Sequence, residues 1–249
     1  MTVRGDPALP ASQGPNVDLL SRLGHQLRSP LAGIIGLSRI LATRLAAGTA
    51  DPTQLARQLD LIRTTAAGAL SAIERMIDIA RIDSGRVTGD LRPIDCREVL
   101  TETARTFQSA AQQRGLCLET ELPADPVIAI TDPAVLGRIL TELVGNAVKF
   151  TDTGGVRLRI TATTAGSATR PGPTPTVIEV ADDGPGVPAG ERIRIFDPFE
   201  HGENVTDGSA GLGLHLARRL ADLISAEVTI RDQSGPGSTF AVTFPGRPT

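Results

Sequence analysis

The 249-residue sequence predicts an α+β protein built from two parts. After a short leader, apolar residues recur every three or four positions as far as residue 83, which is the spacing of one face of a helix. Beyond residue 90, short stretches that alternate apolar and polar residues are mixed with further helical stretches. Because these strands and helices do not alternate regularly, we expect a helical hairpin followed by an α/β sandwich.

The composition excludes several classes of protein. A net charge of −3, 2% aromatic residues and no basic block argue against a nucleic-acid partner. Cys96 and Cys117 are too few for a disulfide scaffold, so we expect a reducing cytoplasm and assign both to the core. No apolar run is long enough to span a bilayer and the first residues do not resemble a signal peptide, so we expect no membrane contact from this chain itself.

The helical hairpin is predicted for residues 16–84. Residues 1–15 are rich in Pro, Gly and Ala and are expected to be a disordered leader or linker. The first helix should run to about residue 47, and Gly48–Pro52 should form the turn into a second helix that ends near residue 83. The apolar row comprises Leu20, Leu23, Leu27, Leu31, Ile34, Leu41 and Leu45 in the first helix, and Leu55, Leu59, Ile62, Ala66, Ala69, Ile73, Ile77 and Ala80 in the second. One hairpin cannot bury both rows, so we expect a homodimeric four-helix bundle formed through residues 16–84.

His25 lies off the apolar row of the first helix. It follows Leu23 by two residues, about 200° around the helix, so its imidazole should point into solvent. Five residues later Pro30 has no amide hydrogen for the carbonyl of Gln26, and the helix should loosen or bend there. This stretch alone fits either a surface histidine or a reactive one.

Residues 84–90 break the helical pattern, and we expect a second domain over 91–249. We predict helices over about 95–114, 133–150 and 210–223, and strands over about 117–122, 127–130, 156–163, 176–181, 227–232 and 238–244. Residues 164–175 are rich in Gly, Pro, Ser and Thr and should form a loop.

The predicted helix 133–150 carries three polar residues on one face. Glu142, Asn146 and Lys149 are separated by four and three positions. Carboxylate and amide oxygens suit Mg²⁺, and a lysine offsets phosphate charge, so this face could hold a metal against phosphates. An ordinary solvated polar face remains the alternative.

Glycine-rich stretches follow this helix. Asp182, Gly184 and Gly186 come at the end of a predicted strand, where glycines let the backbone approach a flat ligand and a carboxylate can accept from an exocyclic amine such as that of adenine. The stretch 208–214 lies at a predicted helix start, where free amides favour phosphate. Phe199 ends the stretch before a polar segment that could act as a lid, and neither glycine cluster is a P-loop.

Residues 16–244 as a whole resemble the transmitter core of a bacterial sensor histidine kinase, which joins a HisKA-type dimerisation and phosphotransfer hairpin to an ATP-binding domain of the Bergerat (GHKL) fold. The family's boxes occur in its order: an H box at His25, an N box ending at Asn146, a DxGxG box at Asp182, an F box at 196–199, and GLGL and terminal glycine boxes. The order of these boxes, more than any one of them, makes the resemblance specific.

The resemblance implies a role for each matching residue. His25 would be the phosphoacceptor, with Gln26 and Ser29 as its catalytic neighbours. Asn146 would be the Mg²⁺ ligand with Glu142 beside it, and Asp182 would be the carboxylate that binds adenine, supported by Gly184 and Gly186. The further nucleotide-binding residues would be Lys149, Phe199, Gly211, Leu212, Gly213 and Thr239. The γ-phosphoryl group of Mg-ATP would pass to His25 and then to an aspartate of a separate response regulator, because no receiver domain is present in this sequence.

The sequence departs from the family pattern at Gln26 and at His201. Gln26 replaces the usual Glu or Asp after the histidine, and an amide can orient the imidazole but cannot take up its proton. Ser29 keeps the hydroxyl of the family's phosphatase position, while His201 stands where many relatives have a lid arginine.

Two alternative functions remain. One is a GHKL-fold ATPase that uses Glu142 to activate water. The other is a dimeric scaffold that binds nucleotide with weak or no autokinase activity.

Overall fold

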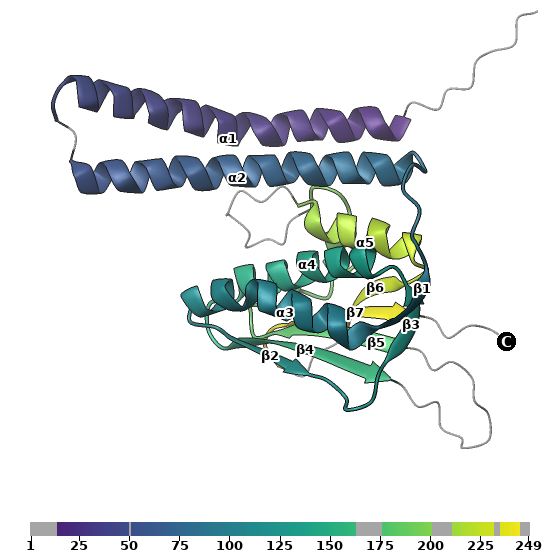
Figure 1. Cartoon of the computed structure of the whole chain (residues 1–249). Coiled ribbons are helices and arrows are strands. Elements are labelled where there is room, and N and C mark those ends of the chain that lie inside the picture. Colours follow the sequence, from purple (N-terminus) through teal and green to yellow (C-terminus); the bar gives the residue numbers. More distant parts are fainter. Residues whose placement is uncertain (1–13, 50, 163–175, 201–210, 232–234, 245–249) are drawn as a thin grey trace, which may run out of the picture. The chain divides into compact units, whose positions relative to one another are not determined.

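The computed structural model describes residues 14–49, 51–162, 176–200, 211–231 and 235–244 (Figure 1). The chain divides into two compact units, residues 1–74 and 75–249, and each is described by itself. The predicted lid histidine, His201, and the predicted loop 164–175 lie outside the described residues.

The first unit contains α1 (Gly14–Ala46) and most of α2 (Pro52–Asp83). α1 continues through Pro30 without interruption, so the proline does not end the helix. The backbone amide of Gln54 donates to the Asp51 carboxylate at 3.0 Å, which caps the first turn of α2. The two helices that the apolar periodicity predicts are therefore confirmed.

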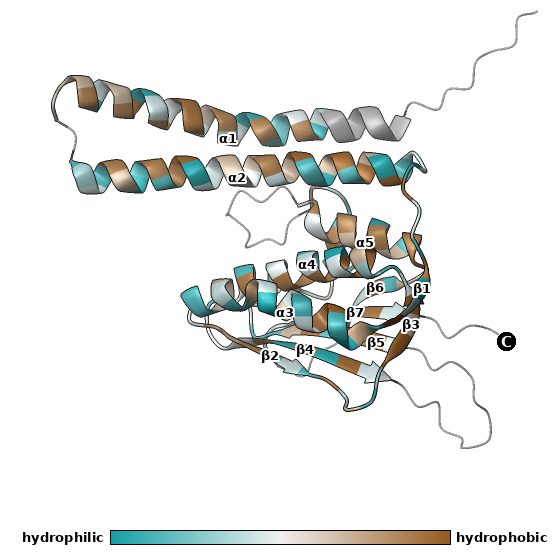
Figure 2. Cartoon of the chain, viewed as in Figure 1, coloured by the Kyte–Doolittle hydropathy of each residue, from teal (hydrophilic) through white to brown (hydrophobic). Residues whose placement is uncertain are grey.

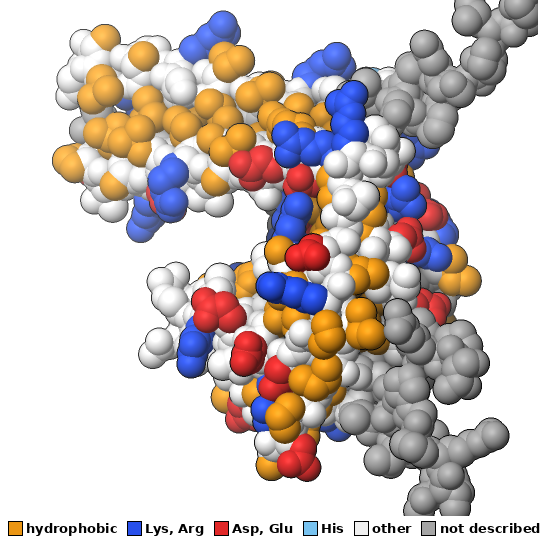
Figure 3. All heavy atoms as spheres, turned by 45° about the vertical axis from the view of Figure 1, so that its right-hand side comes forward, with side chains coloured by type: hydrophobic (Ala, Val, Ile, Leu, Met, Phe, Trp, Pro, Cys, Tyr) orange, Lys and Arg blue, Asp and Glu red, His pale blue; other side chains and the backbone are white. Residues whose placement is uncertain are grey.

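Large apolar side chains remain exposed along both helices. Figure 2 shows hydrophobic residues spread along both helices. They are Leu31, Ile35, Ile40, Leu45, Leu59, Leu61, Leu70, Ile73 and Ile77. Figure 3 shows hydrophobic side chains along much of the length of the hairpin. A monomeric hairpin would leave these residues in water, which is the physical reason to expect a partner helix pair.

The second unit is built on a five-stranded mixed sheet with the order β2-β4-β5-β7-β6. Its strands are β2 (Cys117–Glu121), β4 (Gly155–Ala162), β5 (Thr176–Asp182), β6 (Glu227–Arg231) and β7 (Ser238–Phe244). β2 and β4 are parallel and the other neighbours are antiparallel. Ile160, Ile178 and Val242 are opposite one another in adjacent strands and at most 4% exposed, so they form the centre of the buried face.

Three helices cover that face: α3 (Cys96–Gln113), α4 (Pro133–Phe150) and α5 (Gly213–Leu223) (Figure 1). α4 is the central helix, because it packs against both α3 and α5. Its start is set by the Asp132 side chain, which accepts from the amides of Ala134 and Val135. The α+β prediction for this domain is thus confirmed.

The structure differs from the sequence prediction at short elements and at one cysteine. A four-residue strand, β1 (Arg92–Asp95), pairs with β3 (Ile128–Thr131) in a separate two-stranded sheet, and η1 (Arg194–Phe196) is a single 3₁₀ turn. Segments this short carry too little periodicity to be recognised. Cys96 is buried as expected, but Cys117 is exposed on the edge strand β2, so its assignment to the core was wrong.

Candidate functional site

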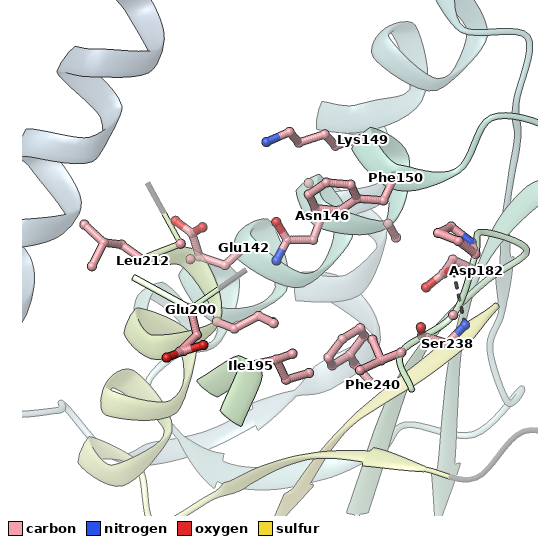
Figure 4. A pocket seen from close by; sticks show the side chains of 18 of the residues that line it. Glu142, Asn146, Lys149, Phe150, Asp182, Ile195, Glu200, Leu212, Ser238 and Phe240 are labelled. Atoms are coloured by element: carbon pink, nitrogen blue, oxygen red, sulfur yellow. Dashed lines mark hydrogen bonds between the residues drawn. The ribbon is translucent and has the colours of Figure 1, made fainter. Parts of the chain in front are cut away.

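The second unit contains a cavity of about 370 Å³. Its walls come from α4, from the turn after β5, from residues 185–195, from the start of α5 and from the start of β7. Residues that are far apart in the sequence therefore meet at one place (Figure 4).

Helix α4 supplies the polar wall of the cavity. Glu142, Asn146 and Lys149 all line it, and the opposite face of α4 carries the fully buried Leu140 and Val144. Figure 4 shows Asn146 between Glu142 and Asp182. The amide, carboxylate and ammonium groups that the sequence places on one helix face thus point into a common space.

Asp182 lies at the end of β5 and is 6% exposed. Its Oδ1 accepts hydrogen bonds from the backbone amides of Gly184, at 2.9 Å, and Ser238, at 3.2 Å. Among the described residues, Oδ2 has no hydrogen-bonding partner, and Asp182 lines the cavity. Burial raises the pKa of the Asp182 carboxyl above its ordinary value, although the two amide hydrogen bonds oppose this. The carboxyl group is therefore held rigidly with one oxygen available to a ligand.

Glycines allow the backbone to close around Asp182. A Cβ on Gly237 would lie 1.8 Å from the carbonyl oxygen of Asp182, and Gly237 has a φ of +98°. A Cβ on Gly186 would lie 2.8 Å from the carbonyl oxygen of Gly237. The turn after β5 and the turn before β7 can approach this closely only without side chains.

The second glycine stretch meets α4 across the cavity. α5 begins at Gly213, and a Cβ there would lie 2.7 Å from Oε2 of Glu142. Gly211 and Leu212 also line the cavity, and the Phe199 amide donates to the Gly211 carbonyl at 3.0 Å. Phe199 has a φ of 66°, an unusual conformation for a residue with a side chain.

The structure brings together most, but not all, of the sequence-predicted site residues. Those that line the cavity are Glu142, Asn146, Lys149, Asp182, Gly186, Gly211, Leu212 and Gly213. Gly184, Phe199 and Thr239 do not line it; Thr239 neighbours Ser238 in β7 and therefore faces the other side of the sheet.

His25, Gln26 and Ser29 belong to the other unit and are exposed on α1. The prediction that His25 is exposed to solvent is confirmed. His215 has a different environment, because its Nδ1 lies 3.0 Å from the Phe196 carbonyl oxygen. That contact fits a packing role for His215.

Some cavity residues were not predicted. Phe150, Ile195 and Phe240 are apolar lining residues, and Arg75 reaches the cavity from the last turns of α2. The glycines at 235 and 237 signalled a turn near Ser238, but no local pattern indicates which backbone amide binds Asp182 or that Arg75 lies beside Glu142.

Comparison with known proteins identifies the class of this fold and site. Residues 131–248 match the family described as "Histidine kinase-, DNA gyrase B-, and HSP90-like ATPase", and this range includes every residue that lines the cavity except Arg75 and Phe107. Residues 16–85 match the "His Kinase A (phospho-acceptor) domain", which covers the helical hairpin. In this order the two domains match the transmitter core of a sensor histidine kinase, and the chain belongs to that family.

Individual relatives agree with this assignment. The chain is 33% identical over 249 residues to the aerobic respiration control sensor protein ArcB of Escherichia coli, covering 97% of this chain and 30% of ArcB. It is 29% identical over 232 residues to the autoinducer 2 sensor kinase/phosphatase LuxQ of Vibrio parahaemolyticus, covering 92% of this chain and 26% of LuxQ. The chain thus spans less than a third of the length of either relative.

Solved structures of similar fold include ShkA and AdeS. Full-length ShkA, in a complex with AMPPNP, is similar with a TM-score of 0.62 and 28% identity, covering 93% of this chain and 46% of ShkA. The Acinetobacter baumannii histidine kinase AdeS has a TM-score of 0.63 at 18% identity, covering 88% of this chain and 96% of AdeS, and shows the fold alone. In the described part of the chain, no helix is both long and apolar enough to cross a membrane.

Proposed function

We propose that this chain is the catalytic core of a two-component sensor histidine kinase, which phosphorylates His25 from ATP and passes the phosphoryl group to an aspartate of a response regulator. The observation that carries the proposal is the cavity in which Asp182 and the polar face of α4 meet, in a chain that also exposes a histidine on a HisKA hairpin. A nucleotide site and a phosphoryl acceptor are the two parts that this reaction needs.

The cavity suits an adenine nucleotide. The Oδ2 of Asp182 can accept from the exocyclic amine, while Ile195 and Phe240 offer apolar surface to the base. Lys149, on the polar wall, would face the phosphates.

Mg²⁺ is the metal that this donor set favours. The amide oxygen of Asn146 and the carboxylate of Glu142 are hard oxygen ligands on one helix face. Among the described residues, no group of three or more His, Cys, Asp or Glu could hold an ion, so phosphate oxygens would have to complete the shell. When bound, the metal would neutralise phosphate charge and orient the nucleotide.

His25 would act as the nucleophile through a neutral imidazole nitrogen. Gln26 can orient the ring through its carbonyl oxygen but cannot accept the proton that leaves it, so we expect slow autophosphorylation. The Ser29 hydroxyl would support dephosphorylation of the partner. We further propose that the chain forms a homodimer through residues 16–84, that its catalytic domain spans residues 91–249 and that it is located in the cytoplasm.

Incubation with Mg-[γ-³²P]ATP tests the function. Wild type should acquire acid-labile, base-stable label, whereas His25→Gln and Asn146→Ala should lose it. His215→Gln is the matched control, because His215 contacts the Phe196 carbonyl and does not line the cavity. Phosphate release without labelling would favour the ATPase, and nucleotide binding without either would favour the scaffold.

A further inference from the structure

The last turns of α2, residues 75–83, belong to the second unit and form three ion pairs within it. Asp78 pairs with Arg138 of α4, and Asp83 pairs with Arg219 of α5. The third pair joins Arg75 to Glu142 of α4. Two of these pairs lie outside the cavity, whereas both Arg75 and Glu142 line it.

The geometry of the Arg75–Glu142 pair leaves most of the guanidinium unused. The Nε of Arg75 donates to both carboxylate oxygens, at 2.9 and 3.0 Å. Among the described residues, neither Nη group of Arg75 has a hydrogen-bonding partner. The four remaining N–H groups have the planar arrangement that matches two oxygens of a phosphate.

Burial and charge indicate that the Nη groups of Arg75 bind an anion in the cavity. The side chains of Arg75 and Glu142 are 32% and 12% exposed, so the pair lies partly inside the protein. Of the described residues that line the cavity, Glu142, Asp182, Glu191 and Glu200 are acidic, and only Arg75 and Lys149 are basic. These carboxylates would repel a triphosphate in this cavity, and Arg75 and Lys149 are the described lining side chains that could offset this repulsion beside a bound Mg²⁺.

We propose that Arg75 is a phosphate-binding residue of the nucleotide site, positioned by Glu142 and donating from its Nη groups to the terminal phosphate of ATP. Glu142 accepts from Nε and thereby fixes the plane of the guanidinium before the nucleotide arrives, and the remaining lone pairs of its carboxylate are those that the proposed Mg²⁺ would use. The end of α2 then contributes directly to nucleotide affinity. This inference rests on the proposed function, because it requires that the cavity binds ATP.

Calorimetric titration of the full chain with ATP, ADP and AMP in Mg²⁺ buffer tests the inference. Arg75→Ala should weaken ATP binding by about 10-fold or more, since a lost charge-assisted hydrogen bond has roughly that effect. AMP affinity should stay within about twofold, because AMP lacks the terminal phosphate, and Arg75→Lys should recover part of the ATP affinity. Arg138→Ala is the matched control: it removes a comparable ion pair of α2 outside the cavity and should leave ATP affinity unchanged.

The possible outcomes separate this inference from the proposed function. If wild type binds ATP and Arg75→Ala binds it equally well or more tightly, Arg75 is only a structural or blocking residue and the inference is wrong. An equal loss of ATP and AMP affinity in Arg75→Ala also overturns it, since the whole cavity would then be disturbed. A wild-type chain that binds no adenine nucleotide overturns both proposals.

Discussion

Asp182 illustrates at the residue scale how a binding group can reduce stability. Its carboxyl is buried, and this raises its pKa above the ordinary value of 3.8. The unfolded chain therefore loses this proton at a lower pH than the folded chain does. As pH rises from about 4 through the folded-state pKa, the free energy of unfolding falls, and the cost persists at neutral pH.

Asp182→Asn should therefore separate stability from binding. The amide keeps an oxygen for the Gly184 and Ser238 amides but carries no buried charge, so the variant should unfold at an equal or higher temperature than wild type at pH 7. Its nucleotide affinity should fall about 10-fold or more, because an amide hydrogen would face the adenine amine. Thermal unfolding from pH 4 to 7, with nucleotide titration, measures both effects. A less stable variant at pH 7 would contradict the argument.

Gln26 provides a second test at the residue scale. Gln26→Glu should accelerate autophosphorylation about 10-fold or more, because a carboxylate can accept the imidazole proton. Initial rates of ³²P incorporation measure the effect, with Gln26→Met as a control of similar length that accepts no proton. Equal rates for wild type and Gln26→Glu would show that proton transfer does not limit the reaction.

At the scale of elements, two turns meet at the end of the cavity where we propose that adenine binds. Asp182 is the last residue of β5, and its carboxylate accepts from the amide of Ser238, the first residue of β7. Gly237 permits their close approach, since a side chain there would overlap the Asp182 carbonyl. The position of the Asp182 carboxylate thus depends on the contact between the turn after β5 and the turn before β7, which are distant in the sequence.

Gly237→Ala should cost about 3 kcal/mol or more of unfolding free energy, because it combines a positive φ with a Cβ only 1.8 Å from a backbone oxygen. Gly190→Ala is the matched control, since a Cβ there would meet nothing within 4 Å. Urea unfolding monitored by circular dichroism measures the difference. Similar midpoints for the two variants would show that the turns can separate without cost.

At the scale of the whole molecule, the exposed apolar residues of the hairpin predict self-association. Ile35 and Leu59 are each 52% exposed, and placing glutamates at both positions should dissociate a dimer. Light scattering after size exclusion would measure the mass of wild type and of the double variant. Ile193→Glu is the control, because Ile193 is 80% exposed but lies outside the hairpin and should not affect the mass. A monomeric wild type would contradict the prediction.

Local patterns in the sequence determined the helices, the main strands and the identity of eight residues that line the cavity. The apolar spacing of α4 predicts its bounds and the shared face of Glu142, Asn146 and Lys149, because both follow from helical periodicity alone. The order of the glycine and asparagine boxes also sufficed to recognise the family.

Only the tertiary structure decided which distant groups meet. It places the Ser238 amide on Asp182, turns Thr239 to the other side of the sheet, exposes Cys117 on an edge strand and sets Arg75 beside Glu142. Strand order and helix packing depend on contacts between segments far apart in the chain, and no local periodicity encodes them. For that reason the sequence could identify Glu142 as a site residue, whereas only the fold could show that Arg75 positions a guanidinium against it.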